Sequence, residues 1–188
     1  MPETSNEIVI KRIIDQEWDM FHSVKASEPA ACQEEEGTFR LMRWMSHSVL
    51  PGALLEALED QLEQAAAQGR NLMTEKYARM GNQIPPLKDN PRIGAIVAAE
   101  RDWMVALHQR WPLTFPGTGE RFEAYLAADL ETWSDRSLEL CSAFVQAALA
   151  EGRNPVQDRY ANLFQRMGYA SIEEREQKTR MQMFKCAQ

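Results

Sequence analysis

Two glutamates occupy positions where a helical pattern calls for apolar side chains. Glu17 interrupts an apolar stripe between Ile13/Ile14 and Phe21, and Glu100 interrupts a second such stripe 83 residues later. A buried, ionised carboxylate costs several kcal/mol unless a partner pairs or hydrogen-bonds it. The sequence therefore predicts either a partner for each glutamate or a ligand on which both converge.

Further polar residues interrupt or lie on the apolar stripes. Asp129 interrupts a stripe in a later helix, and Tyr77 and Tyr160, again 83 residues apart, need partners for their hydroxyls when their rings are buried. One interpretation is a polar network in which the tyrosines, Arg43 or Trp indoles donate to the two glutamates. The other is a carboxylate-lined ligand site formed by Glu17, Arg43, Tyr77, Glu100, Asp129 and Tyr160.

The same carboxylates suggest an alternative in catalysis. Two carboxylates held close together split their pKa values, so that Glu17 and Glu100 would act as acid and base. Cys32 precedes the acidic run "QEEE" near an expected helix start, where a thiolate is stabilised. It is a further catalytic candidate, although a cysteine in such a position is more often simply packed.

The spacing of histidines and glycines disfavours other chemistry. Helical di-metal proteins use Glu-x-x-His on facing helices, and the nearest spacing here is Asp19-x-x-His22, which is not repeated. We therefore expect no metal. The sequence contains no glycine-rich phosphate-binding pattern, and no cofactor is expected.

One stretch occurs twice. "GRNLMTEKYARM" at 69–80 matches "GRNPVQDRYANL" at 152–163, again with an offset of 83. Glycine suits the left-handed residue that ends a helix, and asparagine suits the cap of the next, so "GRN" predicts a helix–helix joint. Lys76 and Arg159 fall off the apolar stripes and are expected on a solvated face.

Helical periodicity runs through the whole chain, and no period-two strand pattern of useful length occurs. Ser5, Thr38, Ser134 and Asn154 are predicted helix caps. The prediction is an all-α fold with a pseudo-two-fold internal repeat of two four-helix units around one core, plus a C-terminal amphipathic helix. The expected units are 1–85, 86–170 and 171–188, within a single compact domain.

Composition limits the partners. The net charge of −7, from 28 acidic and 21 basic residues, argues against nucleic-acid binding and against an anionic membrane surface. No apolar run approaches the roughly 18 residues of a membrane span. Three sparse cysteines and a polar start, "MPETSNEIVIKR", favour a cytoplasmic location.

Several motifs resemble a bacterial family catalogued as domain of unknown function 4125. These are "EWDMFHSV", Cys32-Gln33, "TFRLMR", "GRNLMTEKYARM" and "FEAYLAADLETWSD", whereas "WMSHSVLPGA" departs from the family pattern. The resemblance covers nearly the whole chain. It implies an α-helical, cytoplasmic bacterial protein without an assigned activity, and it supplies no catalytic residues.

The leading functional prediction is a module that binds a small polar or cationic ligand between the repeats. An enzyme using the two glutamates is the first alternative. The second is a protein with a purely structural polar core that docks a protein partner, or a second copy of itself, through the last helix.

Overall fold

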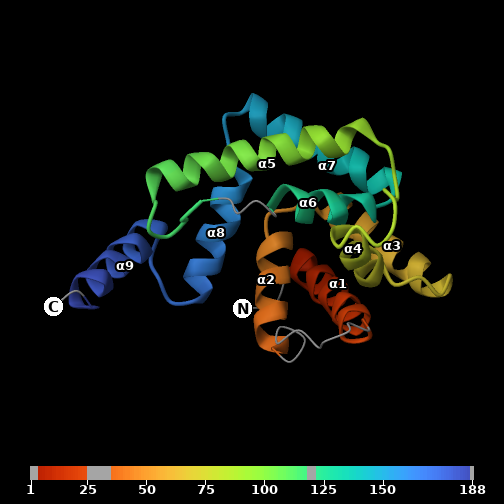
Figure 1. Cartoon of the computed structure of the whole chain (residues 1–188), viewed down its shortest axis with the longest axis horizontal. Helices are drawn as coiled ribbons and strands as arrows, with labels where there is room; N and C mark the ends of the chain where they lie inside the picture. Colours follow the sequence, from red (N-terminus) through yellow and green to blue (C-terminus); the bar gives the residue numbers. More distant parts are fainter. Residues whose placement is uncertain (1–3, 25–34, 118–121, 187–188) are drawn as a thin grey trace.

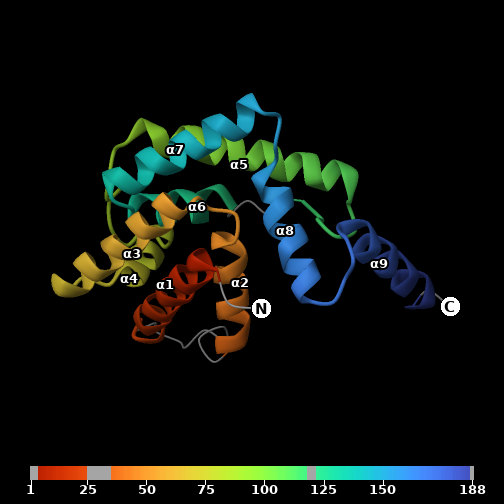
Figure 2. The same ribbon diagram turned by 180° about the vertical axis from the view of Figure 1, so that it is seen from behind.

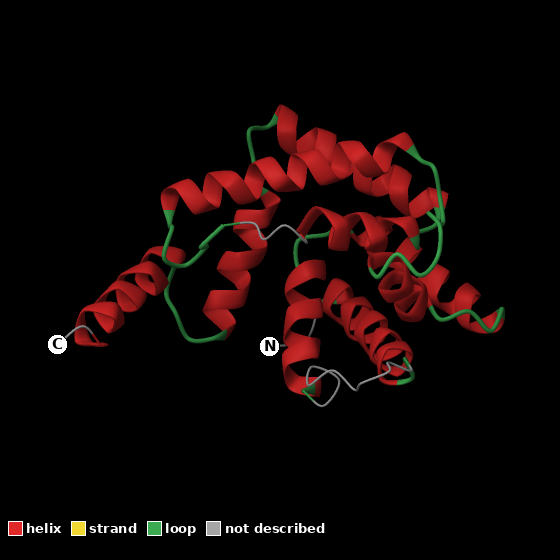
Figure 3. Cartoon of the chain, viewed as in Figure 1, coloured by secondary structure: helices red, strands yellow, loops and turns green. Residues whose placement is uncertain are grey.

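The computed structural model describes residues 4–24, 35–117 and 122–186, with side chains described to residue 183. Cys32 lies outside these residues. The described part is helical and contains no strand (Figure 3). Its helices are α1 (Ser5–His22), α2 (Glu36–His47), α3 (Gly52–Ala67), α4 (Leu72–Met80), α5 (Pro91–Arg110), α6 (Phe122–Glu131), α7 (Asp135–Ala150), α8 (Pro155–Arg166) and α9 (Ile172–Cys186).

The helices of the two sequence halves interlock. α1 packs against α2, α3 and α4, and α5 packs against α6, α7 and α8. In addition, α2 contacts α8, α4 contacts α6, and α3 contacts α7. The long helices α5 and α7 run together along one side of the molecule (Figures 1 and 2). α9 lies at one end of the molecule, and α3 and α4 lie at the other end.

A continuous hydrophobic core joins both halves. Its most deeply buried side chains come from α1, α3, α7 and α8, including Ile13, Leu55, Leu138 and Val156, each with no exposed surface. Burying such a side chain stabilises the fold by about 1.5–3 kcal/mol. This packing fixes the positions of α1 and α5, the two helices that carry the predicted glutamates.

The repeated "GRN" stretches are helix–helix joints, as predicted. Gly69 and Gly152 have φ of 68° and 64°, a left-handed conformation that glycine adopts without strain. Arg70 N donates to Ala65 O at 2.8 Å, which satisfies a carbonyl at the end of α3. Arg153 N makes the same bond to Ala148 O at 2.9 Å.

The asparagine of each joint makes two kinds of contact. Asn71 caps α4 by accepting from Thr74 N at 2.8 Å, and its Nδ2 donates to Met20 O of α1 at 2.8 Å. Asn154 caps α8, and its Nδ2 donates to Trp103 O of α5 at 3.2 Å. Each joint is therefore tied to the helix that carries one of the glutamates.

Two predicted caps are wrong and a third is confirmed. Thr4, not Ser5, caps α1, because a capping box forms between Thr4 and Glu7. α2 begins at Glu36 without a side-chain cap, so Thr38 lies inside the helix. Ser134 caps α7 by accepting from Ser137 N at 3.0 Å.

In the described part of the chain, no helix combines the length and the apolar character that crossing a bilayer requires.

Candidate functional site

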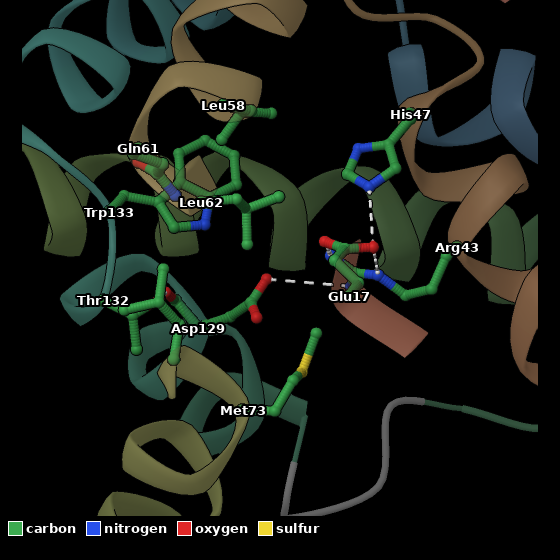
Figure 4. Close-up of a pocket in the computed structure, with 11 residues that line it drawn as sticks. Glu17, Arg43, His47, Leu58, Gln61, Leu62, Met73, Asp129, Thr132 and Trp133 are labelled. Carbon is green, nitrogen blue, oxygen red and sulfur yellow. Dashed lines mark hydrogen bonds and ion pairs between the residues drawn. The ribbon is translucent and has the colours of Figure 1, made fainter. Parts of the chain in front are cut away.

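Glu17 of α1 lies in a buried cluster with two residues of α2. Its Oε2 accepts from Arg43 Nε at 2.7 Å, and its Oε1 accepts from Arg43 Nη2. His47 Nε2 lies 3.2 Å from the same Oε2. Glu17 and His47 are only 4% and 3% exposed. Figure 4 shows the carboxylate between the guanidinium and the imidazole.

A second ion pair lies beside this cluster. Lys76 Nζ of α4 binds Asp129 Oδ1 of α6 at 2.6 Å, and Arg43 Nη1 lies 4.0 Å from Asp129 Oδ2. The Lys76 ammonium also lies 3.8 Å from the centre of the Tyr125 ring, a cation–π contact. The chain of contacts from Glu17 through Arg43 and Asp129 to Lys76 thus joins four helices, which we call the first charge cluster.

The first charge cluster holds its carboxylates ionised. Burial alone would raise the pKa of Glu17, but the charge of Arg43 and that of His47 when it is protonated, together with their hydrogen bonds, bring that pKa well below its usual range. Burial likewise opposes ionisation of Asp129, and the nearby Lys76 and Arg43 lower its pKa. Both groups are therefore carboxylates at neutral pH.

Glu100 of α5 lies in a smaller cluster of its own. Arg159 of α8 donates from Nη2 to Oε2 at 2.6 Å and from Nη1 to Oε1 at 3.3 Å. We call this pair the second charge cluster. Near it, burial raises the pKa of Tyr160 and raises the pKa of the Cys141 thiol to about 12. Cys141 is therefore a neutral thiol, not an activated nucleophile.

Two cavities of very different size adjoin the charge clusters, and the first charge cluster borders both. A cavity of about 20 Å³ adjoins Glu17, Arg43, His47 and Asp129, which is room for about one water molecule. A second cavity of about 300 Å³ lies between α2, α5, α6, α7 and α8. That volume reaches the lower end of the range for ligand sites, about 300–1,000 Å³.

The larger cavity has a mainly apolar wall with polar groups from both clusters. Apolar side chains such as Ile96, Leu126 and Phe144 line it. Its charged and polar lining comes from Arg43, His47, Asp129, Glu100, Arg159 and Tyr160. A mainly apolar cavity with a few converging polar groups is typical of a small-molecule site.

Two buried nitrogen atoms, in residues that line this cavity, have no hydrogen-bond partner among the described residues. They are His47 Nδ1 and Arg159 Nε. Both residues line the larger cavity, and His47 also lines the water-sized one. A buried polar atom without a partner costs about 1–3 kcal/mol. The two atoms are therefore candidates for contact with a bound molecule.

Four of the six predicted ligand-binding residues line the larger cavity: Arg43, Glu100, Asp129 and Tyr160. Glu17 lines the water-sized cavity. Tyr77 lines neither of the two; its ring lies 5.7 Å from that of Phe21 and beside Lys76. Glu17 and Glu100 are both buried but sit in separate clusters, each bound by its own arginine.

The prediction of a solvated face for Lys76 and Arg159 is wrong. Lys76 is 1% exposed and the Arg159 side chain is 17% exposed. The prediction failed because α4 packs on α6 as well as on α1, so more than one of its faces is covered. A signal was present, since a basic residue follows each buried glutamate by 59 positions in both halves.

His47 is the other site residue that sequence reasoning missed. Its place near the end of α2 gives no repeat signal, because Leu130 stands 83 positions later. Among residues with described side chains, no group of three or more His, Cys, Asp or Glu is placed to hold a metal ion.

Over the residues that the structure describes, the protein is all-helical, with buried, paired charges beside a cavity. The chain belongs to the family described as protein of unknown function, DUF4125, which it matches over residues 7–177. The resemblance seen in its motifs is therefore confirmed. No curated protein and no solved structure matches the chain significantly.

Proposed function

We propose that this protein binds a small molecule in the larger cavity, between α2, α5, α6, α7 and α8. The observation that carries the proposal is the cavity of about 300 Å³ itself. A pocket of this size with a mainly apolar wall leaves side-chain surface without packing partners, and a bound molecule would supply them. Two of the lining residues, His47 and Arg159, also carry a buried nitrogen without a partner among the described residues, which further supports a bound molecule.

Binding is better supported than acid–base catalysis by Glu17 and Glu100. Each carboxylate accepts two hydrogen bonds from one guanidinium, and Arg43 helps to lower the pKa of Glu17. Glu17 is therefore a poor base near neutral pH, because catalysis favours a pKa close to the working pH. The two glutamates act instead as fixed anchors for the arginines at the cavity wall.

The site belongs to an organisation that we propose to be a pseudo-two-fold repeat, with units 1–85 and 86–170 followed by a C-terminal segment, 171–188. Corresponding helices support it: α1 packs on α2, α3 and α4 as α5 packs on α6, α7 and α8. The hydrogen bonds Asn71 to Met20 O and Asn154 to Trp103 O also correspond, with both partners shifted by 83 residues.

A cavity-filling variant tests the proposed function. Cys141 lines the cavity from α7, and Leu58 occupies the matching position in the first half. Cys141→Leu should fill part of the cavity, whereas Ala143→Leu, on an exposed position of the same helix, is the matched control. Xenon enters apolar cavities without needing polar contacts.

In ¹H–¹⁵N spectra under xenon pressure, the amides of Leu126 and Phe144 should shift in the unmodified protein and in Ala143→Leu. They should shift far less in Cys141→Leu. Native mass spectrometry of freshly purified protein would add the mass of any retained compound. Absence of xenon shifts at the cavity wall would contradict the proposal.

α9 favours a second candidate function, the docking of a protein partner. Its first turns are fixed, because Ile172 is buried and the Glu176 carboxylate accepts from Thr114 N at 2.7 Å. Beyond them, Met181 and Met183 are 56% and 58% exposed. If this end of α9 joins two copies, Met181→Ser with Met183→Ser should abolish the dimer in sedimentation velocity, whereas a monomer in the unmodified protein would exclude self-association.

A further inference from the structure

We infer that the larger cavity takes a small uncharged molecule with an apolar body, whose carbonyl-type acceptor binds Arg159 Nε and whose hydroxyl or N–H donates to His47 Nδ1. The inference rests on the proposed function and names the class of ligand for that site. It narrows the sequence-based expectation of a small polar or cationic ligand to an uncharged one.

The balance of charge at the wall is the first argument. The buried acids and bases form matched pairs: Glu17 with Arg43, Asp129 with Lys76, and Glu100 with Arg159. The three carboxylates that could attract a cation are already neutralised, and so are the cations that could attract an anion. A net charge on the ligand would be buried without a counter-charge, which costs several kcal/mol.

The orientation of Arg159 gives the position of the acceptor. Its two terminal nitrogens bind the Glu100 carboxylate, which leaves Nε–H as the donor without a partner. Arg159 lines the larger cavity and not the water-sized one. A guanidinium N–H only donates, so its partner must be an acceptor, and the inferred ligand supplies that acceptor.

His47 requires the opposite kind of group. Its Nε2 faces a carboxylate, which accepts only, so this nitrogen carries the proton that it shares with Glu17. The inferred ligand meets His47 as a neutral imidazole, in which Nδ1 is then an acceptor and needs a donor. A ligand that satisfies both atoms carries one acceptor and one donor, separated by an apolar body that lies against Leu126 and Phe144.

Four matched aromatic probes test this class. 4-Hydroxybenzamide is uncharged and carries both groups; benzamide lacks the hydroxyl. 4-Hydroxybenzoate and 4-hydroxybenzylamine have the same size but carry a negative and a positive charge at neutral pH. The affinity of each is measured by following cavity amides during an NMR titration. We expect 4-hydroxybenzamide to bind at least about tenfold more tightly than either charged probe.

Conservative variants separate the two contacts. Arg159→Lys keeps a cation beside Glu100 but removes Nε–H, and should weaken 4-hydroxybenzamide about tenfold without changing the xenon shifts. Arg153→Lys, at an exposed position of the α7–α8 joint, is the control and should change neither. His47→Gln keeps a donor toward Glu17 but loses the Nδ1 acceptor. It should remove the advantage of 4-hydroxybenzamide over benzamide.

The outcomes distinguish this inference from the proposed function. Equal or tighter binding of a charged probe, or full affinity in Arg159→Lys, would overturn the ligand class while xenon still enters the cavity. Retention of the hydroxyl preference in His47→Gln would overturn the His47 contact, and would be expected if water fills the small cavity and serves Nδ1. Loss of the xenon signal itself would overturn the proposed function and this inference together.

Discussion

The two buried glutamates occupy matching positions in the two halves of the chain, yet they take different partners. Glu100 binds Arg159, which follows it by 59 residues within the second half. The matching basic residue in the first half is Lys76, but it binds Asp129 of the second half instead. Glu17 is left to Arg43 and His47 of α2.

Two residues account for this difference. Asp129 matches Ser46 at the offset of 83, and Arg43 matches Leu126. Asp129 draws Lys76 across to α6, and Arg43 supplies the cation that Glu17 then needs. Ser46 carries no charge, and its hydroxyl donates to Met42 O of the same helix at 3.0 Å. One base in the first half and one acid in the second thus change the pairing of Glu17 and Lys76 without changing the net charge of the cluster.

The same comparison explains the unequal cavities. Around the first charge cluster, Leu58 and Leu62 of α3 and the long polar side chains leave room for about one water. At the matching place in the second half, Cys141 replaces Leu58, and Ser46 stands where Asp129 would be. Smaller side chains leave about 300 Å³. Positions related by the offset of 83 thus border a nearly filled space at Leu58 and a larger cavity at Cys141.

Removing Arg43 should have the largest effect on stability. Arg43→Leu installs the residue of the matching position but leaves the Glu17 carboxylate buried with only His47 beside it, and takes a cation from Asp129. Breaking a buried pair in this way costs about 3–5 kcal/mol. Urea unfolding measures the loss, and Arg40→Leu on the same helix, whose side chain is 36% exposed, should cost less than about 1 kcal/mol. Equal losses of unfolding free energy in the two variants would show that the buried pair stabilises the fold no more than an exposed one.

Acid should weaken the first charge cluster next. The pKa values of Glu17 and Asp129 are lowered on folding, so the unfolded chain takes up protons at a higher pH than the folded one. Their contribution to stability is present above about pH 4 and is lost as the pH falls through the folded pKa values.

The free energy of unfolding should therefore fall steeply below about pH 4. Glu17→Gln should flatten that slope, whereas Glu123→Gln, whose side chain is 54% exposed, should leave it unchanged. An unaltered slope in Glu17→Gln, measured by urea unfolding at several pH values, would contradict the argument.

Giving the first half the same glutamate–base pairing as the second half should recover part of the stability lost in Arg43→Leu. Arg43→Leu combined with Asp129→Ser removes both of the residues that distinguish the halves. Lys76 is then free to pair with Glu17, as Arg159 pairs with Glu100. We expect the double variant to recover about 2 kcal/mol of the loss in Arg43→Leu, a coupling that a double-mutant cycle measures. Additive losses would show that Lys76 cannot reach Glu17.

The cavity comparison predicts opposite effects of one exchange. Leu58→Cys opens space in the filled half and should cost about 2 kcal/mol. Cys141→Leu fills space in the other half and should change stability by less than about 1 kcal/mol. Thermal and urea unfolding of the two variants check this. A similar loss in both would mean that the wall of the larger cavity is as closely packed as that of the smaller one.

Much of the fold could be predicted from the sequence because its signals are local. Helical periodicity, the "GRN" joints and the cap at Ser134 depend on residues a few positions apart. The cap at Thr38 failed because Glu36 already begins the helix.

The burial of Glu17 and Glu100 could also be predicted, since both interrupt an apolar stripe. Their partners could not, because pairing depends on which helices meet. A stripe reports one buried face, whereas α4 is covered by both α1 and α6, so Lys76 was placed outside. Lys76 pairs with Asp129 and not with Glu17 because α4 packs against α6. Helical periodicity carries no information about such a contact between distant helices.

The smallest expected difference between the halves lies in the two joints. Both asparagines cap a helix and donate to a carbonyl of the glutamate-bearing helix, but Asn71 does so at 2.8 Å and also donates to Ser23 Oγ at 2.9 Å. Asn154 makes the longer bond, 3.2 Å, to Trp103 O. Replacing a cap asparagine by alanine costs about 0.5–2 kcal/mol.

Asn71→Ala should therefore cost about 0.5 kcal/mol more than Asn154→Ala, since two donated bonds disappear instead of one weaker bond. Replacement by aspartate keeps the cap acceptor and loses only the Nδ2 donor, so the aspartate variants isolate the contact with α1 or α5. The Asn71 variant should again be the weaker protein in urea unfolding. If the order reversed, the tie between joint and helix would matter more in the half that contains the cavity, where the neighbouring packing is less complete.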